Sequence, residues 1–300
     1  MFFSTLTLLI TACSEKEVQE EEGKDWNSAD LKELSSGECP DMSQSGELVS
    51  FLSSGEERNV TFVLPSNPQP KMKLIFFYHG LVGAGSNPTT YTAEALDFQG
   101  FADAHNAMFI LPESKIWELM AQQFHMWNVE EGTSDQDLAL FDDLRTCAAQ
   151  NFDVNLDMLT SGGFSGGALF NTVLLSERSD TLAGVVEMSG GADIEVASFE
   201  EDFAPYSTPE HDLPILLISG GENDLWPDPA FTIVHFENAT TTLHERLIAD
   251  ENFVIRCRHN TGHNITNKAF YAAMDWLTNH EYGVPSPYQA SIGDLADWCE

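Results

Sequence analysis

The chain has 300 residues, and its 13 basic and 48 acidic side chains give a formal net charge of −35. A surface this acidic repels nucleic acids and anionic membranes, which argues against DNA or RNA binding. Hydrophobic residues make up 42% of the chain, enough for a globular core, and the length fits one large α/β domain or two small ones.

The first segment, residues 1–12, has the character of a secretory signal. The run from Phe2 to Ala12 is apolar or small and is too short to span a bilayer as a helix. Residues 9–13, Leu-Ile-Thr-Ala-Cys, resemble the lipobox of bacterial lipoproteins, although no Lys or Arg precedes the apolar run. We therefore expect Cys13 to carry a lipid that provides the sole membrane contact, with a plain cleaved signal as the alternative. The predicted location is the bacterial cell envelope, as a lipoprotein, or the medium, as a secreted protein.

Residues 13–47 are rich in Glu, Ser, Gly and Lys, and the acidic run at 15–22 has little to bury. This composition predicts a flexible tether. Beyond Cys13 the chain has four cysteines, at positions 39, 147, 257 and 299. In an exported protein they can form two disulfides, and the sequence leaves three pairings open. No Cys or His spacing indicates zinc, and we expect neither a metal nor another cofactor.

From Leu48 onward, apolar runs of strand length alternate with stretches of helix length. The predicted buried strands are 59–64, 73–78, 107–111, 158–161, 183–188, 214–219 and 253–257. The predicted helices are 90–104, 135–150, 168–177, 231–249 and 267–280. This alternation predicts one α/β domain over residues 48–283, with a mostly parallel central sheet, helices on both faces and a tail at 284–300. Residues 194–213 fit neither period, and we expect them to form a surface excursion that caps a cleft.

A Gly-x-Ser-x-Gly pattern lies between a predicted strand and a predicted helix, at Gly163-Phe164-Ser165-Gly166-Gly167. This pattern holds a serine on a strained strand-to-helix turn, where small neighbours allow the strand, the helix and a substrate to approach closely. A hydroxyl becomes a good nucleophile when a base removes its proton. The context makes Ser165 the candidate nucleophile, whereas the five residues alone also fit an ordinary glycine-rich turn.

Candidate partners for Ser165 follow it in the order acid, then base. Asp224 lies just beyond the predicted strand 214–219, and His263 lies in the loop after the last predicted strand. We expect His263 to accept the proton of Ser165, and Asp224 to orient and stabilise the imidazole. The sequence also leaves Glu222 and Asp228 open as the acid and His259 open as the base.

An acyl-transfer site also needs N–H donors for the oxyanion that forms. The backbone N–H of Gly166, directly after the nucleophile, supplies the first. The second should come from the His79-Gly80 loop that follows an early buried strand, and we choose Leu81, with Gly80 and Val82 as alternatives. We expect His79 to be structural rather than a base.

Aromatic residues near these loops are candidates for substrate contact: Trp226, two residues from Asp224, together with Trp127 and Phe164. Trp117 and Trp127 bound a stretch predicted to be a loop, where an exposed ring could stack on an aromatic or polymeric ester. Packing in or over the core is an equal alternative for these tryptophans.

Residues 73 to about 280 resemble the α/β-hydrolase fold family, and within it the polyhydroxybutyrate-depolymerase and feruloyl-esterase-like group. The resemblance rests on Phe-Tyr-His-Gly-Leu-Val-Gly at 77–83, on the stretch 152–167 that begins Phe-Asp-Val-Asn, and on Thr-Gly-His at 261–263. The chain departs from the group at the nucleophile, where it has Ser-Gly-Gly at 165–167 and relatives often have Ser-Asn-Gly-Gly or Ser-Ala-Gly-Gly. It also departs at Asp-Leu-Trp-Pro, 224–227, where Asp-x-x-Val-Pro is usual.

The motifs and the resemblance together predict a monomeric serine hydrolase that cleaves carboxylic esters through an acyl-enzyme. The resemblance implies extracellular polyesters, or hydroxycinnamoyl or short-chain esters, as substrates. The alternatives are a serine peptidase or amidase that uses the same three residues, and a non-catalytic binding protein of the envelope.

Overall fold

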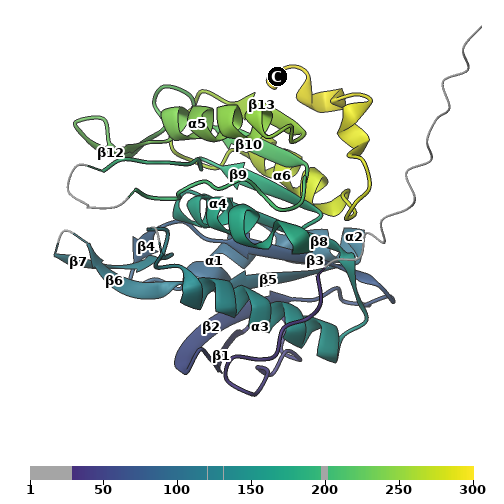
Figure 1. Ribbon diagram of the computed structural model, residues 1–300. Coiled ribbons are helices and arrows are strands. Elements are labelled where there is room, and N and C mark those ends of the chain that lie inside the picture. Colours follow the sequence, from purple (N-terminus) through teal and green to yellow (C-terminus); the bar gives the residue numbers. More distant parts are fainter. Residues whose placement is uncertain (1–28, 120, 131, 197–201) are drawn as a thin grey trace, which may run out of the picture.

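The computed structural model describes residues 29–119, 121–130, 132–196 and 202–300, and this part of the chain contains an eight-stranded mixed sheet (Figure 1). In spatial order the strands are β1 (Leu48–Ser53), β2 (Glu56–Val63), β5 (Ala107–Pro112), β3 (Met72–Tyr78), β8 (Val154–Phe164), β9 (Gly184–Met188), β10 (Ile215–Ser219) and β13 (Val254–Arg258). β1 and β2 pair with their neighbours antiparallel, and the strands from β5 to β13 are all parallel. The predicted mostly parallel α/β sheet is therefore confirmed.

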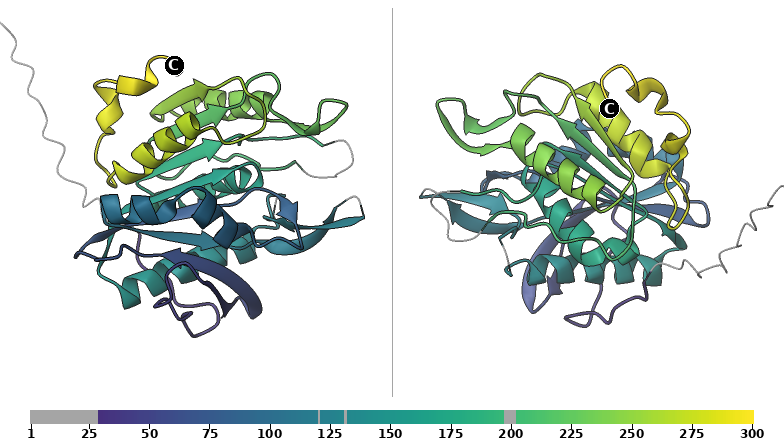
Figure 2. Two further views of the ribbon diagram at one scale, coloured as in Figure 1. Left: turned by 180° about the vertical axis from the view of Figure 1, so that it is seen from behind. Right: turned by 45° about the horizontal axis from the view of Figure 1, so that its top comes forward.

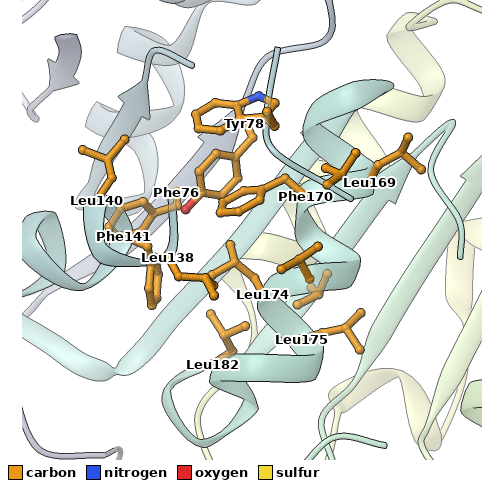
Figure 3. Close-up of a cluster of buried hydrophobic side chains, with 14 of the residues drawn as sticks. Phe76, Tyr78, Leu138, Leu140, Phe141, Leu169, Phe170, Leu174, Leu175 and Leu182 are labelled. Carbon is orange, nitrogen blue, oxygen red and sulfur yellow. The ribbon is translucent and has the colours of Figure 1, made fainter. Parts of the chain in front are cut away.

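Side chains alternate across the central strands, so each face of the sheet builds its own core. On β3, the side chains of Leu74, Phe76 and Tyr78 enter one cluster, whereas Ile75 and Phe77 enter the other. The first cluster packs under α3 (Asp135–Asn151), α4 (Gly166–Arg178) and α5 (Phe236–Ala249), and part of it is drawn in Figure 3. The second packs under α1 (Pro88–Ala95), α2 (Phe98–His105) and α6 (Asn267–Thr278), which are in front in the reverse view of Figure 2. Each large side chain buried in this way contributes about 1.5–3 kcal/mol.

The carboxyl ends of the parallel strands meet at one edge of the sheet, and two small sheets project from that end of the molecule (Figures 1 and 2). The first contains β4 (Val82–Gly83), β7 (Gln122–Met126) and β6 (Lys115–Leu119). The second is the hairpin of β11 (Leu225–Asp228) and β12 (Phe231–His235). Loops from many strands therefore gather where such sheets commonly bind ligands.

Three predicted elements differ from the structure. The helix expected at 90–104 is two helices, because Asp97 takes a left-handed conformation, with φ of 51°, and its side chain caps α2 at the N–H of Gly100. The helix expected at 231–249 begins at Phe236, because the β-branched run before it pairs with β11 as β12. The stretch from Trp117 to Trp127, expected as a loop, is largely the hairpin of β6 and β7.

Residues 29–47 are not the flexible tether that we expected, because they are attached to the domain, first at α3 and then at β2, where the N–H of Gly46 donates to the carbonyl oxygen of Phe62. Lys32 forms an ion pair with Asp142, and the Ser35 hydroxyl and backbone N–H both donate to Asp143. A disulfide joins Cys39 to Cys147. The predicted signal at 1–12, Cys13 and the rest of the tether up to residue 28 lie outside the described residues.

The tail expected at 284–300 is also fixed to the domain. It contains the short 3-10 helices η2 (Pro287–Gln289) and η3 (Gly293–Leu295). A disulfide joins Cys257 to Cys299, so the pairing that the sequence left open is 39–147 and 257–299. Backbone hydrogen bonds between Arg256 and Glu300 place the last residues along β13. Over the described ranges, none of the helices has both the length and the apolar character needed to cross a membrane.

Candidate active site

Ser165 lies on the turn that joins β8 to α4, in a strained conformation. Its φ is 54° and its ψ is −124°, values that non-glycine residues rarely adopt. The neighbouring glycines make the turn sterically feasible. A Cβ on Gly163 would lie 2.6 Å from the backbone of Gly167, and a Cβ on Gly167 would lie 2.2 Å from the carbonyl oxygen of Tyr78. The strand, the turn and the helix therefore approach more closely than side chains would allow, and Ser165 is presented at the end of the sheet.

His263 reaches Ser165 from the loop between β13 and α6. Its Nε2 lies 2.9 Å from the Oγ of Ser165, and its Nδ1 lies 2.7 Å from Oδ1 of Asp224. A carboxylate accepts hydrogen bonds, so Nδ1 carries the proton and the lone pair of Nε2 faces the serine hydroxyl. The structure thus brings Ser165, His263 and Asp224 into hydrogen-bond succession.

Asp224 is fully buried and fully hydrogen-bonded. Its second oxygen, Oδ2, accepts from the hydroxyl of Ser189 at 2.8 Å and from the backbone N–H of Gly220 at 2.7 Å. With His263, three donors face this carboxylate, which offsets the loss of hydration of a buried charge. Ser189 follows β9, and sequence reasoning missed it because nothing in the local sequence links it to a loop 35 residues away.

The alternative acids and base are exposed or are hydrogen-bonded within their own loops. Glu222 is exposed, and Asp228 uses one carboxylate oxygen to accept from the N–H groups of Ala230 and Phe231 in the hairpin turn. His259 faces its own loop, where its Nδ1 lies 2.7 Å from the hydroxyl of Thr261. Burial lowers the pKa of His259 below its usual value.

The imidazole of His263 is held between two aromatic rings. Phe236 stacks on it at a centroid distance of 4.4 Å and an angle of 10°, and Phe164 lies at 4.8 Å and 28°. Phe164, expected to contact substrate, therefore packs against the predicted base as well as lining the cavity beside it. Phe236 was not singled out from the sequence, where it lay inside a predicted helix.

The two N–H groups proposed for the oxyanion lie near each other. A Cβ on Gly166 would be 3.5 Å from the backbone nitrogen of Leu81, so that nitrogen flanks the first turn of α4. Gly166 is the first residue of that helix, and N–H groups at this position lack partners within the helix. The helix dipole adds partial positive charge there.

His79 and Trp127 fix the loop that carries Leu81. Nδ1 of His79 donates to the carbonyl oxygen of Gly80 at 2.6 Å, and its Nε2 accepts from the N–H of Ser114 at 3.1 Å. The indole N–H of Trp127 donates to the carbonyl oxygen of His79 at 2.9 Å. Burial lowers the pKa of His79 to about 4, although its bond to Gly80 acts in the opposite direction. The ring is therefore neutral near pH 7, as its two bonds require.

A second buried carboxyl, that of Glu187 on β9, lies behind the site. Its oxygens accept from the hydroxyl of Thr172 and from the N–H of Gly191, each at 2.9 Å. Burial raises the pKa of Glu187 to about 8, against the effect of these two bonds. The hydroxyl of Thr172 also lies 2.8 Å from the carbonyl oxygen of Gly191, so a protonated Glu187 can donate to Thr172 while Thr172 donates to Gly191. Glu187 thus links α4 to the loop that carries Ser189.

Two cavities meet at Ser165. The wide cavity, of about 790 Å³, is lined by His263, Phe164 and residues of α1. The narrow cavity, of about 70 Å³, lies beneath the two small sheets and is lined by Gly166, Trp127 and Phe203 among others. Trp226 lines both cavities. Of the tryptophans expected near substrate, Trp127 is 3% exposed and combines core packing with a place in the narrow cavity, whereas Trp117 is 41% exposed on β6.

The described parts of the segment 194–213 lie against the body of the domain. Ile194 and Phe203 pair with each other as an isolated bridge, and Phe203 also pairs with Glu130. The side chains of Ile194, Val196 and Ala204 are buried in the first core cluster. Phe203 lines the narrow cavity, so this segment contributes to its wall.

No family model and no curated protein matches the sequence, whereas solved structures do. The solved structure of sOPH superposes with a TM-score of 0.70 at 17% identity, covering 88% of this chain and 96% of that one. The chain has the α/β-hydrolase fold. A ferulic acid esterase matches with a TM-score of 0.57 at 13% identity over 77% of this chain and 96% of its own. S-formylglutathione hydrolase (FrmB) from Staphylococcus aureus gives 0.55 at 14% identity over 78% and 98%. At these identities the likeness establishes the fold.

Proposed function

We propose that this protein is a carboxylic-ester hydrolase that acts through an acyl-enzyme on Ser165. The observation that carries the proposal is the succession from Ser165 to His263 at 2.9 Å and from His263 to Asp224 at 2.7 Å. The strained turn at Ser165 and the paired N–H groups of Leu81 and Gly166 support it. Two proteins that share its fold carry the names ferulic acid esterase and S-formylglutathione hydrolase.

In this mechanism the Oγ of Ser165 attacks the ester carbonyl carbon while Nε2 of His263 takes the hydroxyl proton. The carbonyl oxygen becomes an oxyanion that accepts from the N–H groups of Gly166 and Leu81. Asp224 stabilises the imidazolium without becoming protonated. The intermediate collapses, the alcohol oxygen leaves with the proton from Nε2, and water then releases the acid from Ser165 by the same steps.

The direct test is the variant Ser165→Ala, assayed on p-nitrophenyl butyrate. We expect kcat to fall by about 10⁴-fold or more, because the nucleophile is lost while the fold stays intact, as circular dichroism should show. A fluorophosphonate probe should label the native protein and leave the variant unlabelled, since labelling requires an activated serine. Unchanged turnover in the variant would refute the proposal, and cleavage of peptide amides in preference to esters would move it to an amidase.

We also propose that the protein is exported and carries a lipid on Cys13. The disulfides 39–147 and 257–299 support an oxidising compartment. Metabolic labelling with an alkynyl fatty acid should mark the native protein in a bacterial host and spare a Cys13→Ala variant. Equal labelling of both would exclude Cys13 as the lipid site.

A further inference from the structure

The two cavities at Ser165 differ in chemistry as well as in size. Apart from Ser165 and Gly166, the described residues that line the narrow cavity are apolar, among them Leu119, Met126 and Ile233. The wide cavity mixes apolar groups with polar ones, including Asn87, Thr90 and Glu94. No Lys or Arg is found among the described residues that line either cavity.

The position of His263 decides which part of an ester enters each cavity, given the proposed function on which this inference rests. The leaving alcohol oxygen takes its proton from Nε2, so the alcohol must lie on the side of the imidazole. His263 lines the wide cavity and is not among the described residues that line the narrow one. Of the two proposed oxyanion donors, Gly166 lines the narrow cavity, whereas Leu81 lines both cavities.

We infer that the narrow cavity binds the acyl group and the wide cavity binds the alcohol. The substrate is then an ester of a short aliphatic acid with a bulky alcohol that carries no negative charge. A cavity of about 70 Å³ has room for a few methylene groups and excludes an aromatic hydroxycinnamoyl group. Glu94 and the net charge of −35 repel an anionic alcohol. Of the substrates considered from the sequence, short-chain esters fit and hydroxycinnamoyl esters do not.

The test begins with the native protein and p-nitrophenyl esters of increasing acyl length, which share one leaving group. We expect kcat/KM to rise about threefold to fourfold per added methylene up to about four carbons, and to fall steeply beyond that length. A p-nitrophenyl hydroxycinnamate should be a poor substrate. With the acyl group fixed as acetyl, 2-cyclohexylethyl acetate should be a better substrate than ethyl acetate.

A matched pair of variants assigns the cavities. Ile233, on β12, lines the narrow cavity, and Ile265 lines the wide one; both side chains are half-buried. Ile233→Ala should raise the ratio of hexanoate to acetate turnover by about tenfold or more, because it adds room for about two methylenes. Ile265→Ala should leave that ratio unchanged and alter the preference among the acetate esters.

The outcomes separate this inference from the proposed function. If the native protein prefers the esters with the longest acyl chains, or the hydroxycinnamate, the inference is overturned and the proposed esterase function stands. So would a shift in chain-length preference caused by Ile265→Ala instead of Ile233→Ala. If the native protein cleaves no ester of either series and resists the fluorophosphonate probe, the proposed function fails and the inference fails with it. If a variant does not fold, the series of acyl lengths measured on the native protein still tests the size limit of the narrow cavity.

Discussion

The candidate site has two halves, on opposite sides of Ser165, and each half is held by a different kind of interaction. On the β3 side, the oxyanion loop is fixed by neutral groups that hold backbone carbonyls, through His79 and Trp127. On the β10 and β13 side, the acid and base depend on a fully buried carboxylate, Asp224. The first half relies on fixed dipoles and the second on a buried charge. Removing the charge of Asp224 should therefore lower kcat far more than weakening the hydrogen bonds that orient the oxyanion loop.

The largest effect in this comparison is expected for Asp224→Asn. The amide can donate to Nδ1 of His263, which favours the tautomer with a proton on Nε2, and such a ring cannot accept the proton of Ser165. We expect kcat on p-nitrophenyl butyrate to fall on the order of 10⁴-fold with the fold preserved. Glu222→Gln and Asp228→Asn serve as controls and should keep native turnover, because both side chains are exposed and Asp224 is the carboxylate that contacts His263. A loss below tenfold for Asp224→Asn would mean that another group is the acid.

A smaller effect is expected from His79, which acts as a positioning residue. The carbonyl of Gly80 belongs to the same peptide unit as the N–H of Leu81, so the bond from Nδ1 of His79 orients that N–H. His79→Asn can still donate to Gly80, whereas His79→Gln reaches instead toward the N–H of Ser114. We expect kcat to fall about 10- to 100-fold in His79→Gln with little change in KM, and the Asn variant to recover much of the loss.

Equal losses in the Asn and Gln variants of His79, together with a raised KM, would indicate a merely structural role. The pH–rate profile gives an independent check. His79, with a pKa of about 4, stays neutral above pH 5, so neither variant should move the profile in that range.

The smallest effect on turnover is expected for Glu187→Gln, although its effect on stability depends on pH. A folded-state pKa of about 8, raised from 4.5, means that the folded protein holds a proton that the unfolded chain has lost. The native protein should therefore lose about 1.4 kcal/mol of stability per pH unit from this group as pH rises from 4.5 toward 8.

The Gln variant, which is neutral and can donate to Thr172, should lack this contribution. Its free energy of unfolding in urea, minus that of the native protein, should grow with pH between 5 and 8 while turnover at pH 7 stays near native. A constant difference across this range would show that Glu187 does not hold the extra proton.

Much of the fold could be predicted from the sequence, because parallel strands are buried on both faces and appear in the sequence as apolar runs. All seven predicted strands lie within or overlap the strands of the main sheet. Errors arose where partners distant in the chain decide the local state. The Thr-Ile-Val run at 232–234 becomes a strand because β11 pairs with it, and the hairpin of β6 and β7 shows no strong apolar alternation. The break at Asp97 carried a readable signal, an Asp three residues before Gly100 whose side chain caps a helix.

The candidate site could be predicted from the sequence where the chemistry depends on one residue in one loop, as for Ser165, Asp224 and His263. Groups that hold these residues were missed: Ser189, Phe236 and Glu187 contribute through contacts between elements that are far apart in sequence. Polar composition also misled us at residues 29–47. Lys32 and Ser35 resemble tether residues, and their attachment depends on the acidic pair at 142 and 143 of α3.

The last residues of the chain complete the sheet at one side. Arg256 and Glu300 exchange two backbone hydrogen bonds of 2.8 Å, and the N–H of Arg258 donates to Trp298 at 3.0 Å. A strand left open at the border of a sheet is a template for another chain, and covering it suppresses aggregation. The segment from 298 to 300 therefore covers the open side of β13. A host that cannot form the bond between Cys257 and Cys299 should yield protein that self-associates through this border.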